Sequence, residues 1–173
     1  SYVKDGPGTE LLFHLQPGDE VQATGPFGRL ILEEEIPQRY ILMATGTGVT
    51  PYRSMLPLLA ERIKSHGTQV VVLQGVKTRQ DLLYADDFIA AASLPGFTFY
   101  ACYSREQAPL MDPQPFEHCG YVQDIFNKLE PNPEQDIVYL CGNPSMIDAA
   151  FAQCKAIAFP MPHVRREKYI SPK

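Results

Sequence analysis

Short apolar runs alternate with segments of helical period from Arg39 to the end of the chain. The apolar runs predict five strands, at residues 40–44, 69–74, 97–103, 137–140 and 164–170. Apolar residues spaced three and four apart predict two long helices after Pro51 and Pro144, and two shorter helices are expected at 82–92 and 122–129. Buried strands joined by crossover helices are typical of a parallel sheet. The pattern therefore predicts an α/β domain with a doubly wound, five-stranded parallel sheet over residues 39–173.

Residues 1–38 follow a different pattern. The apolar runs at 11–15, 21–24 and 30–32 are separated by glycine- and proline-containing turns, which predicts short extended segments. The acidic run Glu33-Glu34-Glu35 is predicted to be the linker to the α/β domain. We expect residues 1–38 to be a separate domain segment.

Composition narrows the function classes. With 45% hydrophobic and 20% charged residues, the 173-residue chain can form a buried core. A formal net charge of −5 argues against a nucleic-acid-binding surface, and no apolar run approaches the roughly 20 residues that span a bilayer. Four cysteines without a CxxC pair and four scattered histidines suggest neither a zinc site nor a disulfide framework, so we expect no metal and a reducing, cytoplasmic environment. The chain starts at Ser1 without a leader, and we expect a longer protein upstream of it.

The first strand of the predicted sheet runs directly into Thr45-Gly46-Thr47-Gly48-Val49-Thr50-Pro51, and a helix follows. Two glycines permit a tight turn and a close approach of the backbone to a ligand. Thr50 is predicted to cap the helix and Pro51 to occupy its first turn. The free amides and the helix dipole would then favour an anion such as a pyrophosphate.

A second junction of this kind follows the strand at 137–140, where Cys141-Gly142-Asn143-Pro144 precedes the other long helix. Ligands of doubly wound sheets bind at the carboxyl ends of the strands, where the winding reverses. We therefore expect the two turns to form opposite walls of one dinucleotide site. The alternative is that both are merely tight connections.

These two turns and five further motifs resemble, in order and spacing, the ferredoxin-NADP reductase family of flavoproteins. The resembling motifs are Gly25-Pro26-Phe27-Gly28 with Leu30-Ile31-Leu32 for the end of the flavin-binding barrel, Thr45 to Pro51 for the pyrophosphate loop, Gly75-Val76-Lys77 for the segment after the second strand, Ser104-Arg105-Glu106 for the 2′-phosphate motif, Tyr121-Val122-Gln123-Asp124 for the adenine side, Cys141 to Pro144 for the nicotinamide side, and Glu167-Lys168-Tyr169 for the terminal Glu-x-Tyr. The resemblance covers nearly the whole chain.

The resemblance also implies roles for the residues at the nicotinamide end. Cys141 would lie beside the nicotinamide C4, Glu167 would orient the nicotinamide or relay protons, and Tyr169 would stack on the flavin ring. Each has a structural alternative, namely a buried core cysteine, a solvated carboxylate and an edge-strand aromatic.

At the adenosine end, Arg105 can fork two hydrogen bonds to a phosphate, Ser104 can donate one, and Lys77 adds a positive charge. These residues favour NADP over NAD. The chain departs from the plant-type pattern at Cys119, where those members carry a lysine, and His118 is expected to substitute for it only partly. A tail of four residues, Ile170-Ser171-Pro172-Lys173, follows Tyr169, which ends the chain in plant-type members.

The family's activity, transferred by resemblance, is hydride transfer between NADPH and FAD, followed by electron transfer to ferredoxin or flavodoxin. No Arg-x-Tyr-Ser flavin motif occurs in the sequence, so we expect residues 1–38 to be a remnant of the flavin barrel that retains no FAD and could self-associate through its open edge. Arg165, Arg166 and Lys168 could form a basic cluster for an acidic electron carrier. Two alternatives are the reductase component of an oxygenase system and an NADP-binding module without turnover.

Overall fold

A computed structural model describes residues 6–25 and 27–169, which fall into two compact units separated between Arg29 and Leu30. The second unit is built on one sheet with the strand order β4-β3-β2-β1-β5-β6. The strands are β1 (Arg39–Thr45), β2 (Gln69–Val76), β3 (Phe97–Tyr103), β4 (Glu117–Cys119), β5 (Asp136–Gly142) and β6 (Val164–Lys168). All five neighbouring pairs are parallel, which confirms the predicted doubly wound parallel sheet.

The sheet has one strand more than the sequence predicts. The additional strand, β4, consists of only three residues and pairs with the carboxyl half of β3. Its sequence Glu-His-Cys has no apolar run because it lies at the sheet edge, where only one neighbour is paired and less of the strand is buried. Hydrophobic pattern alone could not have located it.

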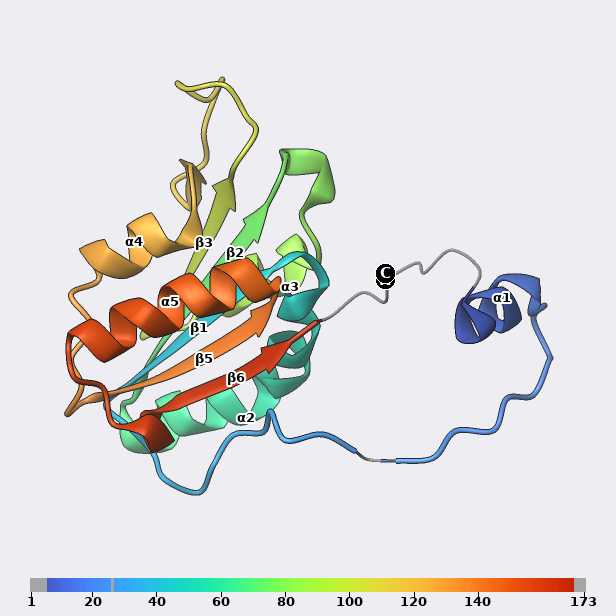
Figure 1. Cartoon of the computed structure of the whole chain (residues 1–173), viewed down its shortest axis with the longest axis horizontal. Helices are drawn as coiled ribbons and strands as arrows, with labels where there is room; N and C mark the ends of the chain where they lie inside the picture. Colours follow the sequence, from blue (N-terminus) through green and yellow to red (C-terminus); the bar gives the residue numbers. More distant parts are fainter. Residues whose placement is uncertain (1–5, 26, 170–173) are drawn as a thin grey trace. The chain divides into compact units, whose positions relative to one another are not determined.

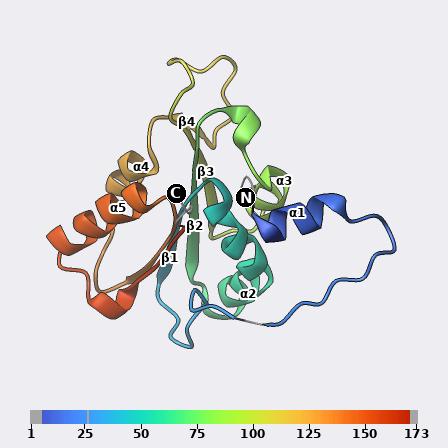
Figure 2. The same cartoon turned by 45° about the vertical axis from the view of Figure 1, so that its right-hand side comes forward.

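Helices cover both faces of the sheet. These helices are α2 (Thr50–His66), α3 (Ala85–Ala91), α4 (Val122–Lys128) and α5 (Pro144–Ala156), with short 3-10 turns η1 (Gly46–Val49), η2 (Arg79–Asp81) and η3 (Met161–His163). Helices α2 and α3 lie on one face and α4 and α5 on the other (Figures 1 and 2). In β1 the side chains alternate between the two cores, with Leu42 packing toward α2 and α3 and Met43 toward α4 and α5. Within the described residues, no helix has the length and apolar character needed to cross a membrane.

The unit before Leu30 differs from the sequence expectation. Residues 11–14, which the pattern placed in an extended segment, belong to helix α1 (Pro7–His14), and no strand forms among residues 6–25 and 27–29. A strand needs a neighbour for its backbone hydrogen bonds, whereas a helix satisfies them internally, as in the bond from the Glu10 amide to the Gly6 carbonyl (2.9 Å). The expected open barrel edge is therefore absent from these described residues.

The segment at 30–38 packs against the sheet unit rather than forming an independent linker. The buried Arg62 donates from Nη2 to the carbonyl oxygen of Glu33 (2.6 Å), and Tyr139 Oη donates to the carbonyl oxygen of Ile31 (3.1 Å). Thr68 Oγ1 donates to the carbonyl oxygen of Pro37 (2.6 Å). The acidic composition of this segment concealed these backbone anchors, which depend on donors far away in the sequence.

Candidate functional site

The winding of the sheet reverses between β1 and β5. From β1 the chain builds outward through β2, β3 and β4, then returns to the other side of β1 to add β5 and β6. The predicted turns at 45–51 and 141–144 follow β1 and β5 and lie at the same edge of the sheet. The backbone amide of Asn143 donates to Thr45 Oγ1 (2.8 Å), so the turns contact each other directly. Doubly wound sheets bind their ligands at the carboxyl ends of the strands where the winding reverses, which is where these two turns lie.

Two glycines allow these turns to interlock. A Cβ atom on Gly48 would lie 2.3 Å from the carbonyl oxygen of Cys141, and one on Gly142 would lie 2.6 Å from both Thr45 O and Thr45 Oγ1. Gly142 also has φ of 123°, which side-chain-bearing residues rarely adopt. The sequence predicts that Gly46 and Gly48 permit a tight turn and the approach of a ligand. In the structure, Gly48 instead makes room for the turn after β5, and Gly142 makes room for Thr45. Gly46 is the glycine that faces open space, because a Cβ atom on it would have no neighbour within 4 Å.

The two long helices begin differently at this edge. Thr50 does not cap α2 as predicted, because the η1 turn leads straight into the helix and Thr50 already has helical angles (φ −57°, ψ −44°). A capping residue needs extended angles, and Asn143 has them (φ −61°, ψ 129°), with its Oδ1 accepting from the Ser145 amide at 2.8 Å. Pro51 and Pro144 occupy the first turns of α2 and α5, as expected. Both helices thus direct their positive ends to the edge that carries the turns.

The three predicted nicotinamide-end residues lie together at the end of β5. Cys141 pairs with Glu167 of β6, and the Tyr169 amide donates to the Gly142 carbonyl oxygen (2.8 Å). Burial raises the pKa of the Cys141 thiol to about 11, with a hydrogen bond to Tyr169 lowering it and the Glu167 charge raising it. The thiol is therefore neutral at physiological pH. The catalytic roles of Cys141, Glu167 and Tyr169 stay predictions.

The three predicted 2′-phosphate residues are neighbours on adjacent strand ends. The Ser104 amide donates to the Val76 carbonyl oxygen (3.0 Å) and the Arg105 amide to that of Lys77 (2.9 Å). Ser104, Arg105 and Lys77 are all exposed, and neither cation forms an ion pair among the residues that the structure describes. Hydrogen bonds from Thr78 lower the pKa of the Asp81 carboxyl group. The positive charges of Lys77 and Arg105 lower this pKa further, because both cations lie near the carboxylate. Both cations are free to bind an anion.

His118 does not substitute for the lysine that Cys119 replaces. Burial, and to a smaller extent Lys128, lowers the pKa of the imidazole, so His118 carries no charge near neutral pH. Its ring packs against Tyr100, with the centroids 5.2 Å apart. The expectation of a partial cationic substitute is therefore wrong, and positive charge at this end comes from Lys77 and Arg105.

The remaining adenosine-side residues divide between packing and exposure. Gly75 makes room for packing, because its Cβ would lie 3.1 Å from Val122 Cγ1. The backbone amide of Tyr121 donates to Asp124 Oδ2 (3.1 Å). The Tyr121 residue is 62% exposed, so its ring is accessible for stacking on a base. The Oε1 atom of Gln123 is buried without a hydrogen-bond partner.

The expected basic cluster near Tyr169 is divided between two faces of β6. Arg165 pairs with Glu33 (3.2 Å), whereas Lys168 pairs with Asp148 of α5 (2.6 Å). Arg166 lies over the ring of Phe151, 3.8 Å from its centroid. Alternation along the strand separates Arg165 from the other two cations, so they do not form one free basic patch.

The four cysteines are predicted to differ sharply in reactivity. Cys119 is exposed, whereas burial raises the pKa to about 12 for Cys102 and to about 11 for Cys141 and Cys154. Thiolates are the reactive species, so a thiol reagent at pH 7.5 should modify one cysteine rapidly and the other three only after unfolding. The Cys119→Ser variant should show no rapid phase, and rapid modification of two or more thiols in the folded protein would contradict the described burial.

The chain is similar in sequence to known oxidoreductases. A family model described as "Oxidoreductase NAD-binding domain" matches residues 42–151. The reductase component of propane 2-monooxygenase from Rhodococcus jostii is 34% identical over 179 residues, covering 98% of this chain and 47% of the relative. A ferredoxin-NADP reductase from Pseudomonas aeruginosa is 32% identical over 166 residues, covering 87% of this chain and 62% of the relative.

Solved structures agree with these sequence relatives. The Amycolatopsis cytochrome P450 reductase GcoB superimposes with a TM-score of 0.79 at 30% identity, covering 96% of this chain and 49% of that one. The chain thus spans about half to three fifths of the length of these similar proteins. Because the family model covers most of the sheet unit, this chain belongs to the oxidoreductase NAD-binding domain family, and its sheet unit is of the ferredoxin-NADP reductase type.

Proposed function

We propose that this chain is the NADP-binding part of a flavin-dependent oxidoreductase. The observation that carries the proposal is the interlocked pair of turns at the switch point, where Gly48 contacts the Cys141 carbonyl region and Asn143 contacts Thr45. A dinucleotide suits this edge because two helix N-termini meet there and two exposed cations, Lys77 and Arg105, lie on the segments that follow β2 and β3. The similarity to ferredoxin-NADP reductases supports the same function.

The two turns would hold the middle and nicotinamide end of the dinucleotide. The pyrophosphate would be bound by the backbone amides of the turn and by the α2 dipole. The amides belong to Thr45, Gly46, Thr47, Gly48, Val49 and Thr50, and Pro51, which has no N–H, would start the helix behind them. Gly46 leaves open space beside the turn for the phosphate to approach. Gly142, Asn143 and Pro144 would form the facing wall.

The adenosine end would select the phosphorylated cofactor. Arg105 and Lys77 supply unpaired positive charge and Ser104 a hydroxyl, while the exposed ring of Tyr121 would stack on the adenine. Gly75 and Gln123 would support this end from the adjoining strand and helix. We infer that the site prefers NADP to NAD.

The chemistry supplied by the bound cofactors is hydride transfer between the nicotinamide and a flavin. The chain's own part would be positioning. Cys141, whose small neutral thiol is buried in this structure, would lie beside the nicotinamide C4. Glu167 would orient the nicotinamide or relay protons, and Tyr169 would stack on the flavin ring. FAD fits the described residues less well, because residues 6–25 and 27–29 form no barrel strand. We infer that residues 1–38 are a remnant of a flavin-binding domain and do not retain FAD by themselves.

The electron acceptor has two candidates. Ferredoxin or flavodoxin follows from the similarity to ferredoxin-NADP reductases. An oxygenase follows from the similarity to the propane 2-monooxygenase reductase component and to the toluate 1,2-dioxygenase electron transfer component of Pseudomonas putida, which is 31% identical over 153 residues. We propose that the acceptor is ferredoxin or flavodoxin.

We also propose that the protein is cytoplasmic, because its four cysteines form no disulfide.

Isothermal titration of the purified chain tests the proposal. We expect one NADP-binding site per chain, weaker binding of NAD, and no visible flavin absorbance in the purified protein. Binding of neither dinucleotide would overturn the function. A stoichiometric flavin would instead overturn only the inference that residues 1–38 cannot retain FAD.

A further inference from the structure

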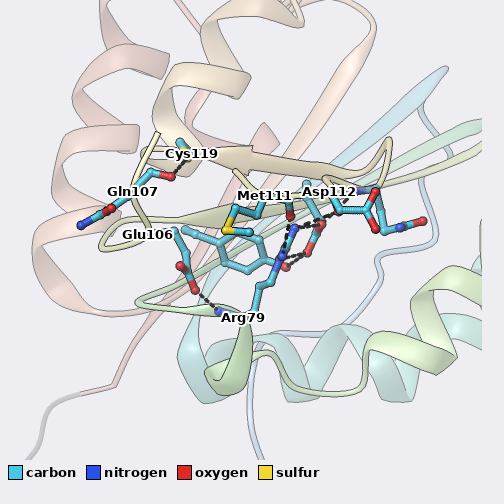
Figure 3. Close-up of polar contacts among 9 residues, drawn as sticks. Arg79, Glu106, Gln107, Met111, Asp112 and Cys119 are labelled. Atoms are coloured by element: carbon cyan, nitrogen blue, oxygen red, sulfur yellow. Dashed lines mark hydrogen bonds and ion pairs between the residues drawn. The ribbon is translucent and has the colours of Figure 1, made fainter. Parts of the chain in front are cut away.

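The loop between β3 and β4, residues 104–116, carries Ser104 and Arg105 at its start and is held by one arginine outside the site. Arg79 lies on η2, after β2, and its guanidinium points into the loop (Figure 3). Its Nη1 donates to the Met111 carbonyl oxygen (2.9 Å) and its Nη2 to that of Asp112 (3.3 Å). Arg79 therefore attaches the tip of the loop to the segment that follows β2.

The same guanidinium also fixes the point where the loop rejoins the sheet. Nε and Nη2 of Arg79 donate to the two carboxylate oxygens of Glu117 at 2.9 and 2.7 Å. Tyr103 Oη (2.7 Å) and the Gln114 amide (2.9 Å) donate to the same carboxylate. Burial would raise the pKa of Glu117, but these hydrogen bonds lower it overall, so the carboxylate is ionised at neutral pH.

The backbone of Arg79 reaches the loop at a third place. Its amide donates to Glu106 Oε1 (3.0 Å), and Glu106 directly follows Arg105. One residue thus contacts the beginning, the tip and the end of the loop. Bidentate pairing with a carboxylate that is only 7% exposed makes this attachment stronger than an ordinary surface ion pair.

Arg79 differs from Arg105 and Lys77 in what its charge contacts. All three cations lie on the segments after β2 and β3, but Arg79 is paired with Glu117 and two carbonyl oxygens, whereas the other two form no ion pair within the described part of the chain. The guanidinium of Arg79 is thus engaged by groups of the protein itself and does not serve as a ligand-binding cation in this arrangement. The structure thus separates cations that hold the loop from cations that the loop presents.

We propose that Arg79 is a positioning residue of the 2′-phosphate site, which holds the 104–116 loop so that Arg105 and Ser104 stay beside Lys77. The inference rests on the proposed function of NADP binding. Without Arg79 the loop gains freedom, and binding must then include the entropy cost of ordering it again. We therefore expect the affinity for NADP to fall and the affinity for NAD to stay nearly unchanged, because only NADP carries the 2′-phosphate.

Titration of the complete chain with NADP and with NAD tests this role. Arg79→Ala should weaken NADP binding about tenfold and leave NAD binding within about twofold, with Arg79→Lys intermediate because an ammonium cannot fork to Glu117 and the carbonyls. In an Arg105→Ala background, adding Arg79→Ala should change NADP affinity by less than about twofold, since the group that it positions is gone.

Arg39 offers a matched control, because it lies at the amino end of β1, at the opposite end of the strands from the proposed site. Its Nε and Nη2 pair with Asp136 at 3.0 and 2.6 Å, and its guanidinium also donates to the carbonyl oxygens of Leu129 and Glu130. Arg39→Ala removes a similar set of contacts, so it should lower stability to a similar extent while the NADP to NAD ratio stays unchanged.

Hydrogen exchange supplies a readout that needs no ligand. Arg79→Ala should speed amide exchange in the loop while leaving the strands β1 and β5 protected. Equal loss of NADP and NAD binding in Arg79→Ala, or an unchanged NADP preference, would overturn the positioning role. A wild-type chain without any NADP preference would instead overturn the proposed cofactor.

Discussion

Replacing Gly48 with alanine is expected to cause a large loss of stability, because the added methyl group would meet the backbone of the facing turn. The new Cβ would lie 2.3 Å from the Cys141 carbonyl oxygen and 2.8 Å from the Gly142 Cα, and both atoms belong to backbone. Because backbone cannot rotate away as a side chain can, the β1 turn must move off β5. We expect a loss of about 3 kcal/mol in the free energy of unfolding, the upper end of the range for overpacked sites, together with loss of NADP binding.

The matched control for stability is Gly46→Ala in the same turn. Gly46 has φ of 53°, but its Cβ would meet no atom within 4 Å, so only left-handed strain of about 1 kcal/mol is expected. Urea unfolding of the two variants and the wild type makes the comparison. Equal losses for Gly48→Ala and Gly46→Ala would show that the two turns do not interlock as described.

Replacing Arg105 with alanine is expected to remove most of the preference for NADP. Arg105 is exposed and unpaired among the described residues, so its guanidinium can make charge-assisted hydrogen bonds to the 2′-phosphate. Hydrogen bonds to charged groups contribute about 1.5–3 kcal/mol, which corresponds to about 10- to 150-fold weaker NADP binding. NAD binding should stay within about twofold.

The control for this prediction is Arg53→Ala. Arg53 is also exposed, but it pairs with Asp87 (2.7 Å) between α2 and α3 and is not part of the proposed site. Titration of both variants with NADP and NAD should show the loss only for Arg105→Ala. An unchanged NADP to NAD ratio in Arg105→Ala would rule out Arg105 as the phosphate ligand.

The sheet could be predicted from the sequence because burial on both faces leaves continuous apolar runs. Residues 40–44 in β1 and 137–140 in β5 are nearly inaccessible, and each run stands out from its polar surroundings. Strand β4 gives no such signal, because a three-residue edge strand needs no apolar run. Helix α1 was missed for a different reason, since its apolar residues 11–13 are exposed and their period does not report a core.

The sequence predicts those parts of the candidate site that carry a local motif, and the parallel-sheet topology predicts that the two turns lie together. The two turns were located because glycine and proline mark strand-to-helix junctions. The sequence predicts Thr50 as the cap of α2, because it does not reveal that η1 precedes the helix. The pairing of Arg79 with Glu117 is a contact between residues 38 apart, which no local pattern predicts.

Backbone amide signals of the isotope-labelled chain, followed by NMR while NADP is added, test the central claim most directly. If both turns hold one dinucleotide, the signals of residues 46–50 and of Gly142, Asn143 and Ser145 should shift together and fit one dissociation constant. Shifts confined to one turn, or two different dissociation constants, would contradict the shared site.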